Sequence, residues 1–268
     1  HLDIRPLRST SEAIIEDLIQ KPENLVQITD NRRYDEYTFA HSVNVAAVSA
    51  MLGVLCHYSK KDLMTLTAGA LLHDIGKLEN PVFFTENQSG TNPHDNLSLV
   101  QSAQIIIRHV SDGMKLADKY KLPKAIKDFI VTHHGTSMAK YFYISFKNKY
   151  PDQEPDPSLF TYPGPNPETL EQAILMMADA VEAASRSLPE YTEESVSALV
   201  EKIIDSQVKE GFFKMCPITF RGIEIAKEVF KAKLKTIYHT RIQYPDEIKK
   251  PEEAGNKNAP SSTPQSIS

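Results

Sequence analysis

Apolar residues recur at helical spacing along most of the chain, and no segment alternates apolar and polar residues in the manner of a β-strand. A clear example begins with a capping-box pattern at Ser59 and Asp62 and continues through the apolar positions Leu63, Leu66 and Ala70. No internal repeat of about 20 to 50 residues is visible. The pattern predicts an all-α fold, a single bundle of about ten helices.

One run, from Thr38 to Ser59, contains no Asp, Glu, Lys or Arg and is nominally long enough to cross a bilayer. It also contains His41, Asn44 and several serines, whose polar groups are costly to place in lipid. We therefore interpret this run as a helix buried in the protein core and not as a membrane span.

The chain divides into three parts. Residues 1–33 are predicted to form a helical lead-in with a capping-box pattern at Ser9 and Glu12. Residues 34–243 carry the main domain. Residues 244–268 are rich in Pro, Ser, Asn and Lys with few apolar side chains, so they are predicted to form a disordered tail. The chain starts at His1 without a signal-peptide pattern, which is typical of a fragment of a longer protein.

Glycine and proline positions predict where helices end. Gly76 is expected to end the helix that follows Ser59, and residues 79–96 are expected to form a long surface loop. One helix is expected at 97–110 and another at 113–120. Further helices are predicted at 123–134, 137–150, 168–188, 193–209 and 221–242.

Charge and cysteine content exclude some classes of function. The chain has 30 Lys and Arg against 35 Asp and Glu, a net charge of -5, which argues against a general binder of DNA or RNA. Its two cysteines, Cys56 and Cys216, lie far apart in the sequence, form no disulfide framework and fit a reducing compartment.

Histidines and aspartates in apolar helical segments carry the candidate chemistry. Asp74 follows His73 at the end of an apolar helix, and burying an ionised aspartate there is costly unless a cation compensates it. Seven residues share this apolar context: His41, His73, Asp74, His109, His133, His134 and Asp179. Each of them alone also fits an ordinary core role. Together, imidazole and carboxylate ligands indicate a site for Fe, Mn, Zn or a similar metal.

Seven ligands exceed one tetrahedral site and indicate two metals that share a carboxylate. A bimetal site clamps a phosphoryl oxygen and lowers the pKa of a bridging water to near neutral, which supplies a hydroxide nucleophile. The pattern therefore indicates a buried bimetal site that acts on phosphate esters.

Six strings occur in one order along the chain: HDIGK (73–77), ENQSGTNPHDNLS (86–98), HVSDG (109–113), HHGTS (133–137), YPGPNP (162–167) and MADAVEAASRSL (177–188). With them the chain resembles the HD-domain metal phosphohydrolase superfamily, and specifically the cytoplasmic HD domain of PgpH-type cyclic di-AMP phosphodiesterases of the seven-transmembrane receptor HD family. The resemblance runs from about Tyr34 to Pro245.

The resemblance implies a ligand set for each metal. One metal would take His41, His73, Asp74 and Asp179. The other would take Asp74, His109, His133 and His134, so that Asp74 bridges the two. By the same resemblance, the ions would be iron or manganese, and His73, Asp74 and Lys77 would be the catalytic residues.

The resemblance also implies the reaction. Cyclic di-AMP would be hydrolysed to pApA by a hydroxide that bridges the metals. The partner would be a cyclic dinucleotide, with no DNA or RNA polymer. The chain would be the cytoplasmic domain of an integral protein of the bacterial cell membrane, joined to the membrane only through an upstream region outside this sequence. The aromatic-rich segment 137–150 is a candidate surface for a homodimer.

Four further residues are candidates for substrate contacts. Lys77 is expected to neutralise charge on the reacting phosphate, although a lysine there also suits a helix C-terminus. Arg186 lies seven residues after Asp179 and shares a helix face with it, so its guanidinium could reach the phosphate or could lie on the surface. His94 is a candidate in the loop at 79–96. Tyr162 could wall a nucleobase or belong to a rigid turn.

Two alternatives stay open at this point. One is another HD enzyme: a cyclic di-GMP phosphodiesterase, a nucleotide phosphohydrolase or a di-iron oxygenase. The HD-GYP class of cyclic di-GMP enzymes carries a GYP string after its paired histidines, whereas here Met138, Ala139 and Lys140 follow HHGTS. The other is a non-catalytic sensor that binds a nucleotide. Asp74→Ala separates these readings, because an enzyme would lose turnover while a sensor could keep nucleotide affinity.

Overall fold

The computed structural model describes residues 36–84 and 92–239. Within these ranges the protein is all-α, with eight α-helices, short 3₁₀ helices and one isolated β-bridge between Met138 and Thr161. This confirms the predicted fold class. The α-helices are α2 (Glu36–Leu55), α3 (Lys60–Leu72), α4 (Leu99–Lys119), α5 (Lys124–Thr132), α6 (Lys140–Lys149), α7 (Leu170–Ser185), α8 (Glu193–Glu210) and α9 (Phe220–His239). The predicted lead-in at 1–33 and tail at 244–268 lie outside the described residues.

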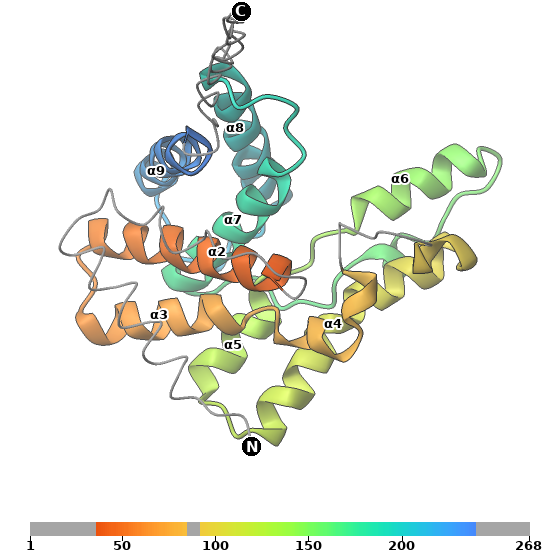
Figure 1. The fold of residues 1–268 in the computed structure, drawn as a ribbon, viewed down its shortest axis with the longest axis horizontal. Helices are drawn as coiled ribbons and strands as arrows, with labels where there is room; N and C mark the ends of the chain where they lie inside the picture. Colours follow the sequence, from red (N-terminus) through yellow and green to blue (C-terminus); the bar gives the residue numbers. More distant parts are fainter. Residues whose placement is uncertain (1–35, 85–91, 240–268) are drawn as a thin grey trace, which may run out of the picture.

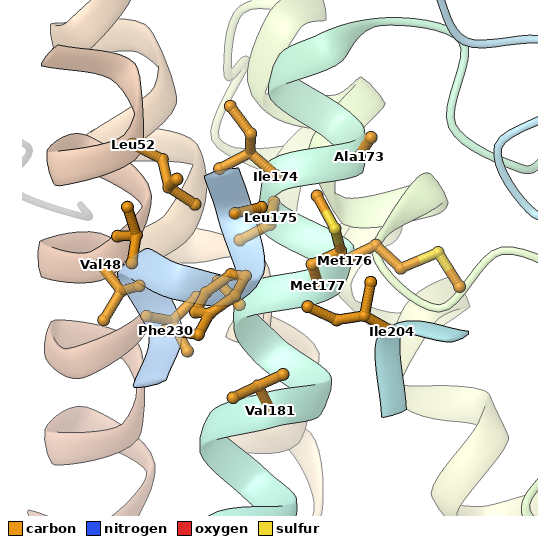
Figure 2. Close-up of a cluster of buried hydrophobic side chains, with 14 of the residues drawn as sticks. Val48, Leu52, Ala173, Ile174, Leu175, Met176, Met177, Val181, Ile204 and Phe230 are labelled. Carbon is orange, nitrogen blue, oxygen red and sulfur yellow. The ribbon is translucent and has the colours of Figure 1, made fainter. Parts of the chain in front are cut away.

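The uncharged run became the core helix α2, as predicted. Figure 1 shows α2 beside α3 and next to α7, with α8 and α9 stacked on α7. Figure 2 shows Val48 and Leu52 of α2 against the α7 segment at 173–177, with Phe230 of α9 and Ile204 of α8 closing the cluster. Each fully buried side chain of this size contributes about 1.5–3 kcal/mol. None of the described helices is long and apolar enough to cross a membrane.

Side-chain caps fix where several helices begin. Ser59 accepts a hydrogen bond from the backbone N–H of Asp62 at the start of α3, as the sequence predicted. Ser98 with Gln101 forms a reciprocal capping box at the start of α4. Thr169 caps α7 in the same way. Each cap contributes on the order of 1 kcal/mol, so the ends of the helices that carry the candidate site are locally determined.

The prediction of two helices, at 97–110 and 113–120, is wrong. The helix α4 runs unbroken through Gly113. The absence of a side chain at this position instead allows two backbone segments to approach each other closely. Gly113 packs against Gly76, which lies in the 3₁₀ helix Ile75–Glu79 just after α3. A Cβ atom on Gly76 would lie 1.9 Å from the carbonyl oxygen of His109 and 2.5 Å from the backbone nitrogen of Gly113. The two glycines therefore bring α4 against the turn that carries Asp74.

The segment predicted as a long loop, 79–96, contains short 3₁₀ helices in its described part, at Pro81–Phe83 and Pro93–Asn96, and the 3₁₀ helix Ile75–Glu79 ends at its first residue. The aromatic-rich helix α6 starts at Lys140 and not at Ser137, because residues 138 and 139 pair with the segment that follows the 3₁₀ helix Pro157–Phe160. In Figure 1, α6 projects away from α7, α8 and α9.

Candidate metal centre

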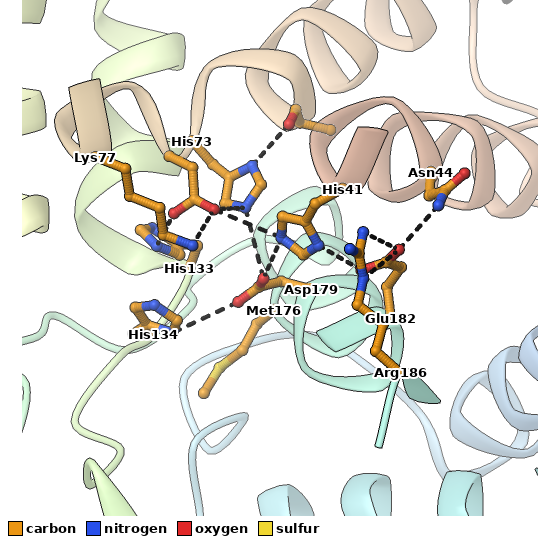
Figure 3. Close-up of polar contacts among 12 residues, drawn as sticks. His41, Asn44, His73, Lys77, His133, His134, Met176, Asp179, Glu182 and Arg186 are labelled. Atoms are coloured by element: carbon orange, nitrogen blue, oxygen red, sulfur yellow. Dashed lines mark hydrogen bonds and ion pairs between the residues drawn. The ribbon is translucent and has the colours of Figure 1, made fainter. Parts of the chain in front are cut away.

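Seven histidine and aspartate side chains from separate elements converge at the centre of the bundle. His41 comes from α2, His73 ends α3, Asp74 follows it, His109 lies in α4, His133 and His134 end α5, and Asp179 lies in α7. All are buried except His134, which is half-buried. These are the seven residues that the sequence predicted as ligands, and Figure 3 labels His41, His73, His133, His134 and Asp179 among them.

The seven side chains form two groups that share Asp74. In each group, one candidate ligand atom per residue lies within 4.8 Å of all the others. The first group is His41, His73, Asp74 and Asp179. The second group is Asp74, His109, His133 and His134. The division coincides with the two ligand sets that the family resemblance implied.

In the first group, the Nε2 atoms of two histidines face two carboxylates. Nε2 of His41 lies 3.0 Å from Oδ1 of Asp179 and 3.5 Å from Oδ2 of Asp74. Nε2 of His73 lies 3.3 Å from Oδ2 of Asp74 and 3.5 Å from Oδ1 of Asp179. The two carboxylates therefore bracket both imidazoles.

In the second group, the other oxygen of Asp74 faces the histidines of α4 and α5. Nε2 of His109 lies 3.3 Å from Oδ1 of Asp74 and 3.1 Å from Nε2 of His133. Nε2 of His133 lies 3.7 Å from Oδ1 of Asp74. Nδ1 of His134 lies 3.5 Å from Oδ2 of Asp179. Asp74 thus presents one oxygen to each group.

Three ligand histidines are oriented by the main chain. Each directs Nδ1 at the carbonyl oxygen three residues earlier: His73 at Ala70 (2.7 Å), His109 at Ile106 (2.6 Å) and His133 at Ile130 (2.8 Å). A carbonyl oxygen can only accept, so Nδ1 carries the proton and donates it. In the neutral ring, Nε2 then presents its lone pair to the centre of the site.

This arrangement fits a metal. The Nε2 atoms of His109 and His133 face each other without a proton to share when both rings are neutral. Among the described residues, the buried Nε2 of His73 and Oδ1 of Asp74 have no hydrogen-bond partner. Buried polar atoms without partners are rare and costly in proteins. Lone pairs that converge from imidazole and carboxylate groups suit a divalent transition metal.

The two groups hold protons differently in the metal-free protein. Burial lowers the pKa of His73, but the carboxylates of Asp74 and Asp179 outweigh burial and raise it to about 10. Burial and neighbouring histidines hold the pKa of His133 well below its usual value, and burial lowers that of His134 to about 3. A metal in the first group therefore displaces protons, whereas the second group is already deprotonated.

The supporting residues predicted from sequence lie in different places. Nζ of Lys77 lies 2.6 Å from Oδ2 of Asp74. The ring of Tyr162 lies 4.2 Å from that of His134, centroid to centroid. His94 packs against the rings of Phe83 and Phe142. These three predicted residues line one pocket of about 410 Å³ above the histidines, together with Phe83, Phe84, Asn92, Ile106, His41, His109, His134, Asp179, Ala180 and Ala183.

Arg186 lies outside this pocket and pairs with Glu182, a residue that the sequence interpretation missed. Its guanidinium donates to the buried carboxylate of Glu182, with Nη2 at 2.7 Å from Oε1, and Glu182 in turn contacts Nδ1 of His41. Arg186 is not among the residues that line the pocket. A signal for Glu182 was present, because Asp179, Glu182 and Arg186 are spaced by three and four residues and therefore share a helix face.

The profile of the HD domain family matches residues 38–184. The cyclic-di-AMP phosphodiesterase PgpH of Bacillus subtilis (strain 168) is 41% identical over 214 residues, 80% of this chain and 29% of that protein. PgpH of Listeria monocytogenes serotype 1/2a (strain 10403S) is 41% identical over 186 residues, 69% of this chain and 26% of that protein. The chain spans less than a third of the length of these two relatives.

The fold of this chain is also similar to that of a solved HD domain. The crystal structure of the L. monocytogenes PgpH HD domain in complex with cyclic-di-AMP aligns with a TM-score of 0.70 at 33% identity. The alignment covers 84% of this chain and 97% of that one. A second structure of the same HD domain aligns with a TM-score of 0.69.

Proposed function

Because the chain belongs to the HD domain family, we propose that it is a metal-dependent phosphodiesterase that hydrolyses cyclic di-AMP to pApA. The observation that carries the proposal is the pair of ligand groups that share Asp74, of which His41, Asp179, His109 and His134 line the pocket. The two PgpH relatives are cyclic-di-AMP phosphodiesterases, and the L. monocytogenes HD domain was solved in complex with cyclic-di-AMP, which supports the choice of nucleotide.

The seven ligands would hold two divalent transition metals, which we propose to be iron or manganese. When bound, such a pair supplies Lewis-acid stabilisation of a phosphoryl oxygen and a nucleophile from water at neutral pH. The chain's own contribution is to fix the two positions. Asp74 places one oxygen in each group, and His73, next to it in sequence, is held by the carbonyl of Ala70.

The residues that line the pocket would bind and orient the nucleotide. The ammonium group of Lys77 lies beside Asp74. Burial lowers the pKa of Lys77, but the carboxylate of Asp74 outweighs burial and raises it. This charge would neutralise a phosphate placed above the metals. Tyr162 and His94 present ring faces and edges at the pocket wall, where we propose that they contact the nucleobases. The volume lies within the range of small-molecule sites.

Arg186 was predicted to contact the phosphate. In the structure its guanidinium is held by Glu182, so direct contact would require that ion pair to break. We propose that Arg186 serves the site through Glu182.

The chain matches only part of each PgpH relative, and this supports a proposal about the protein to which it belongs. We propose that it is the cytoplasmic domain of a longer protein of the bacterial cell membrane, supported by its match to less than a third of each PgpH relative. The partner would be a cyclic dinucleotide and not a DNA or RNA polymer. A homodimer through the exposed aromatic helix α6 stays a prediction.

The test is chromatographic detection of pApA after incubation of cyclic di-AMP with the purified chain and Mn²⁺ or Fe²⁺. Wild type should release pApA, and Asp74→Ala should release none. Asp128→Ala is the matched control, because Asp128 pairs with Lys124 on α5 away from the site. Hydrolysis of cyclic di-GMP in preference would identify another HD enzyme. Nucleotide binding without product from a metal-loaded protein would identify a sensor.

A further inference from the structure

His41 is oriented differently from the ligand histidines that use the main chain. Those residues, His73, His109 and His133, direct Nδ1 at a neutral carbonyl three residues earlier on their own helix. Nδ1 of His41 instead contacts the carboxylate of Glu182, which lies on α7 and 141 residues away in sequence. His41 is thus fixed by a charged group from another helix.

Glu182 is itself fixed on every side. Its side chain is buried, with a relative exposure of 4%. Nδ2 of Asn44 donates to Oε1 at 2.9 Å, and Arg186 donates from Nη2 to Oε1 at 2.7 Å and from Nε to Oε2 at 3.0 Å (Figure 3). Contacts from His41, Asn44 and Arg186 therefore hold the carboxylate in one orientation.

The spacing within each helix makes this arrangement possible. Asn44 lies three residues after His41 on α2, and Arg186 lies four residues after Glu182 on α7, so each pair shares a helix face. A buried ion pair of this kind adds little stability compared with apolar residues of similar volume. Its effect here is on the ring of His41.

The contact determines what His41 presents to the first ligand group. With Nδ1–H directed at Glu182, Nε2 lies 3.0 Å from Asp179 Oδ1 and 3.5 Å from Asp74 Oδ2, and its lone pair would be directed at a metal bound between them. A carboxylate behind a ligand histidine fixes its tautomer and raises its basicity more than a neutral carbonyl does. In the second group, His109 and His133 are backed by carbonyls of their own helices, and Nδ1 of His134 faces Asp179, which is itself a candidate ligand of the first group.

We infer that Glu182, held by Asn44 and Arg186, is a positioning residue that orients His41 and strengthens metal binding in the first ligand group, and leaves the second group unaffected. This inference rests on the two-metal centre of the proposed function, but not on the identity of the nucleotide. It assigns separate supports to the two metal positions. The two ions should therefore respond differently to a change at Glu182.

The test is a Mn²⁺ titration of the metal-stripped chain by equilibrium dialysis, with bound metal counted per chain. Wild type should bind two ions. Glu182→Gln offers one acceptor oxygen, for which His41, Asn44 and Arg186 must compete. This variant should keep one ion at wild-type affinity and bind the other about 10- to 100-fold more weakly. The matched control is Glu201→Gln, which removes a carboxylate paired with lysines of α9.

The outcomes separate a positioning role from a purely structural one. A structural role would lower the melting temperature of the metal-free Glu182→Gln protein and leave the ratio of the two metal affinities unchanged, which would overturn the inference. If Glu182→Gln does not fold, Arg186→Lys keeps the charge but loses the fork that holds Glu182, and should weaken the same single ion. Fewer than two ions in wild type would refute the two-metal centre itself.

Discussion

Replacing Gly76 by alanine should destabilise the protein and disturb the candidate metal centre together. The new Cβ atom would lie 1.9 Å from the carbonyl oxygen of His109 and 2.5 Å from the backbone nitrogen of Gly113. Ordinary contacts begin at 3.4 Å, so the first contact is too short by about 1.5 Å. Both neighbours are backbone atoms, which cannot rotate away as a side-chain end can.

The magnitude follows from what must move. Relief requires α4 to separate from the turn after α3, and overpacking of this kind costs about 1–3 kcal/mol when side chains can adjust. Because backbone must shift here, we expect the upper end, about 3 kcal/mol or more. For a chain of this size that loss lowers the melting temperature by roughly 6–12 °C. Displacement of Asp74, two residues before Gly76, should also weaken metal binding.

Urea unfolding followed by circular dichroism measures the change, with two glycine-to-alanine variants as references. A Cβ on Gly113 would meet Cγ2 of Ile130 at 3.0 Å, a side-chain atom that can adjust, so its cost should be smaller. A Cβ on Gly222, in α9, meets its nearest atom at 3.4 Å, and alanine there should stabilise the helix by up to about 1 kcal/mol. Gly76→Ala with an unfolding free energy within about 1 kcal/mol of wild type would refute the reasoning.

Three further predictions concern the core, the metals and acid. Leu175→Ala removes a fully buried α7 side chain and should lower the free energy of unfolding by about 2–5 kcal/mol in urea; a smaller loss would mean that the cluster repacks. Adding Mn²⁺ at about 100 times its dissociation constant should stabilise the stripped protein by about 2.7 kcal/mol per site, measured as a melting-temperature rise, and Asp74→Asn should abolish this rise. Lys227 and Lys231 lower the pKa of Glu201 in the folded protein below its ordinary value of 4.5. The ionised carboxylate of Glu201 therefore stabilises the fold above pH 4.5, and this stabilisation is lost as the pH falls through the pKa that Glu201 has in the folded protein. Melting temperatures between about pH 6 and pH 3 should therefore fall less steeply in Glu201→Gln than in wild type.

Local sequence signals were sufficient to predict most of the helices. The uncharged run predicted the buried helix α2, and the apolar segment that contains Asp179 predicted α7, because both patterns depend on residues within one helix. The seven candidate ligands could be selected in the same way, since each is a polar residue in an apolar segment. Their convergence into two groups around Asp74 depends on long-range packing, and the family resemblance supplied that division.

Errors arose where a residue acts through a distant partner. The single helix α4 was predicted as two, whereas Gly113 lies inside it and makes a close approach to Gly76, 37 positions earlier. Arg186 was interpreted from its spacing to Asp179 alone. Glu182 lies between them on the same face and is closer to Arg186, yet no local pattern shows that His41 from α2 completes the contact.

The way the site is assembled makes metal binding part of the energetics of folding. Folding brings seven lone-pair-bearing side chains to the centre of the bundle, and buries Nε2 of His73 and Oδ1 of Asp74 without hydrogen-bond partners among the described residues. Buried polar atoms are costly when they are left without hydrogen bonds. A cation bound in both groups would use these lone pairs, so metal loading should stabilise the folded state.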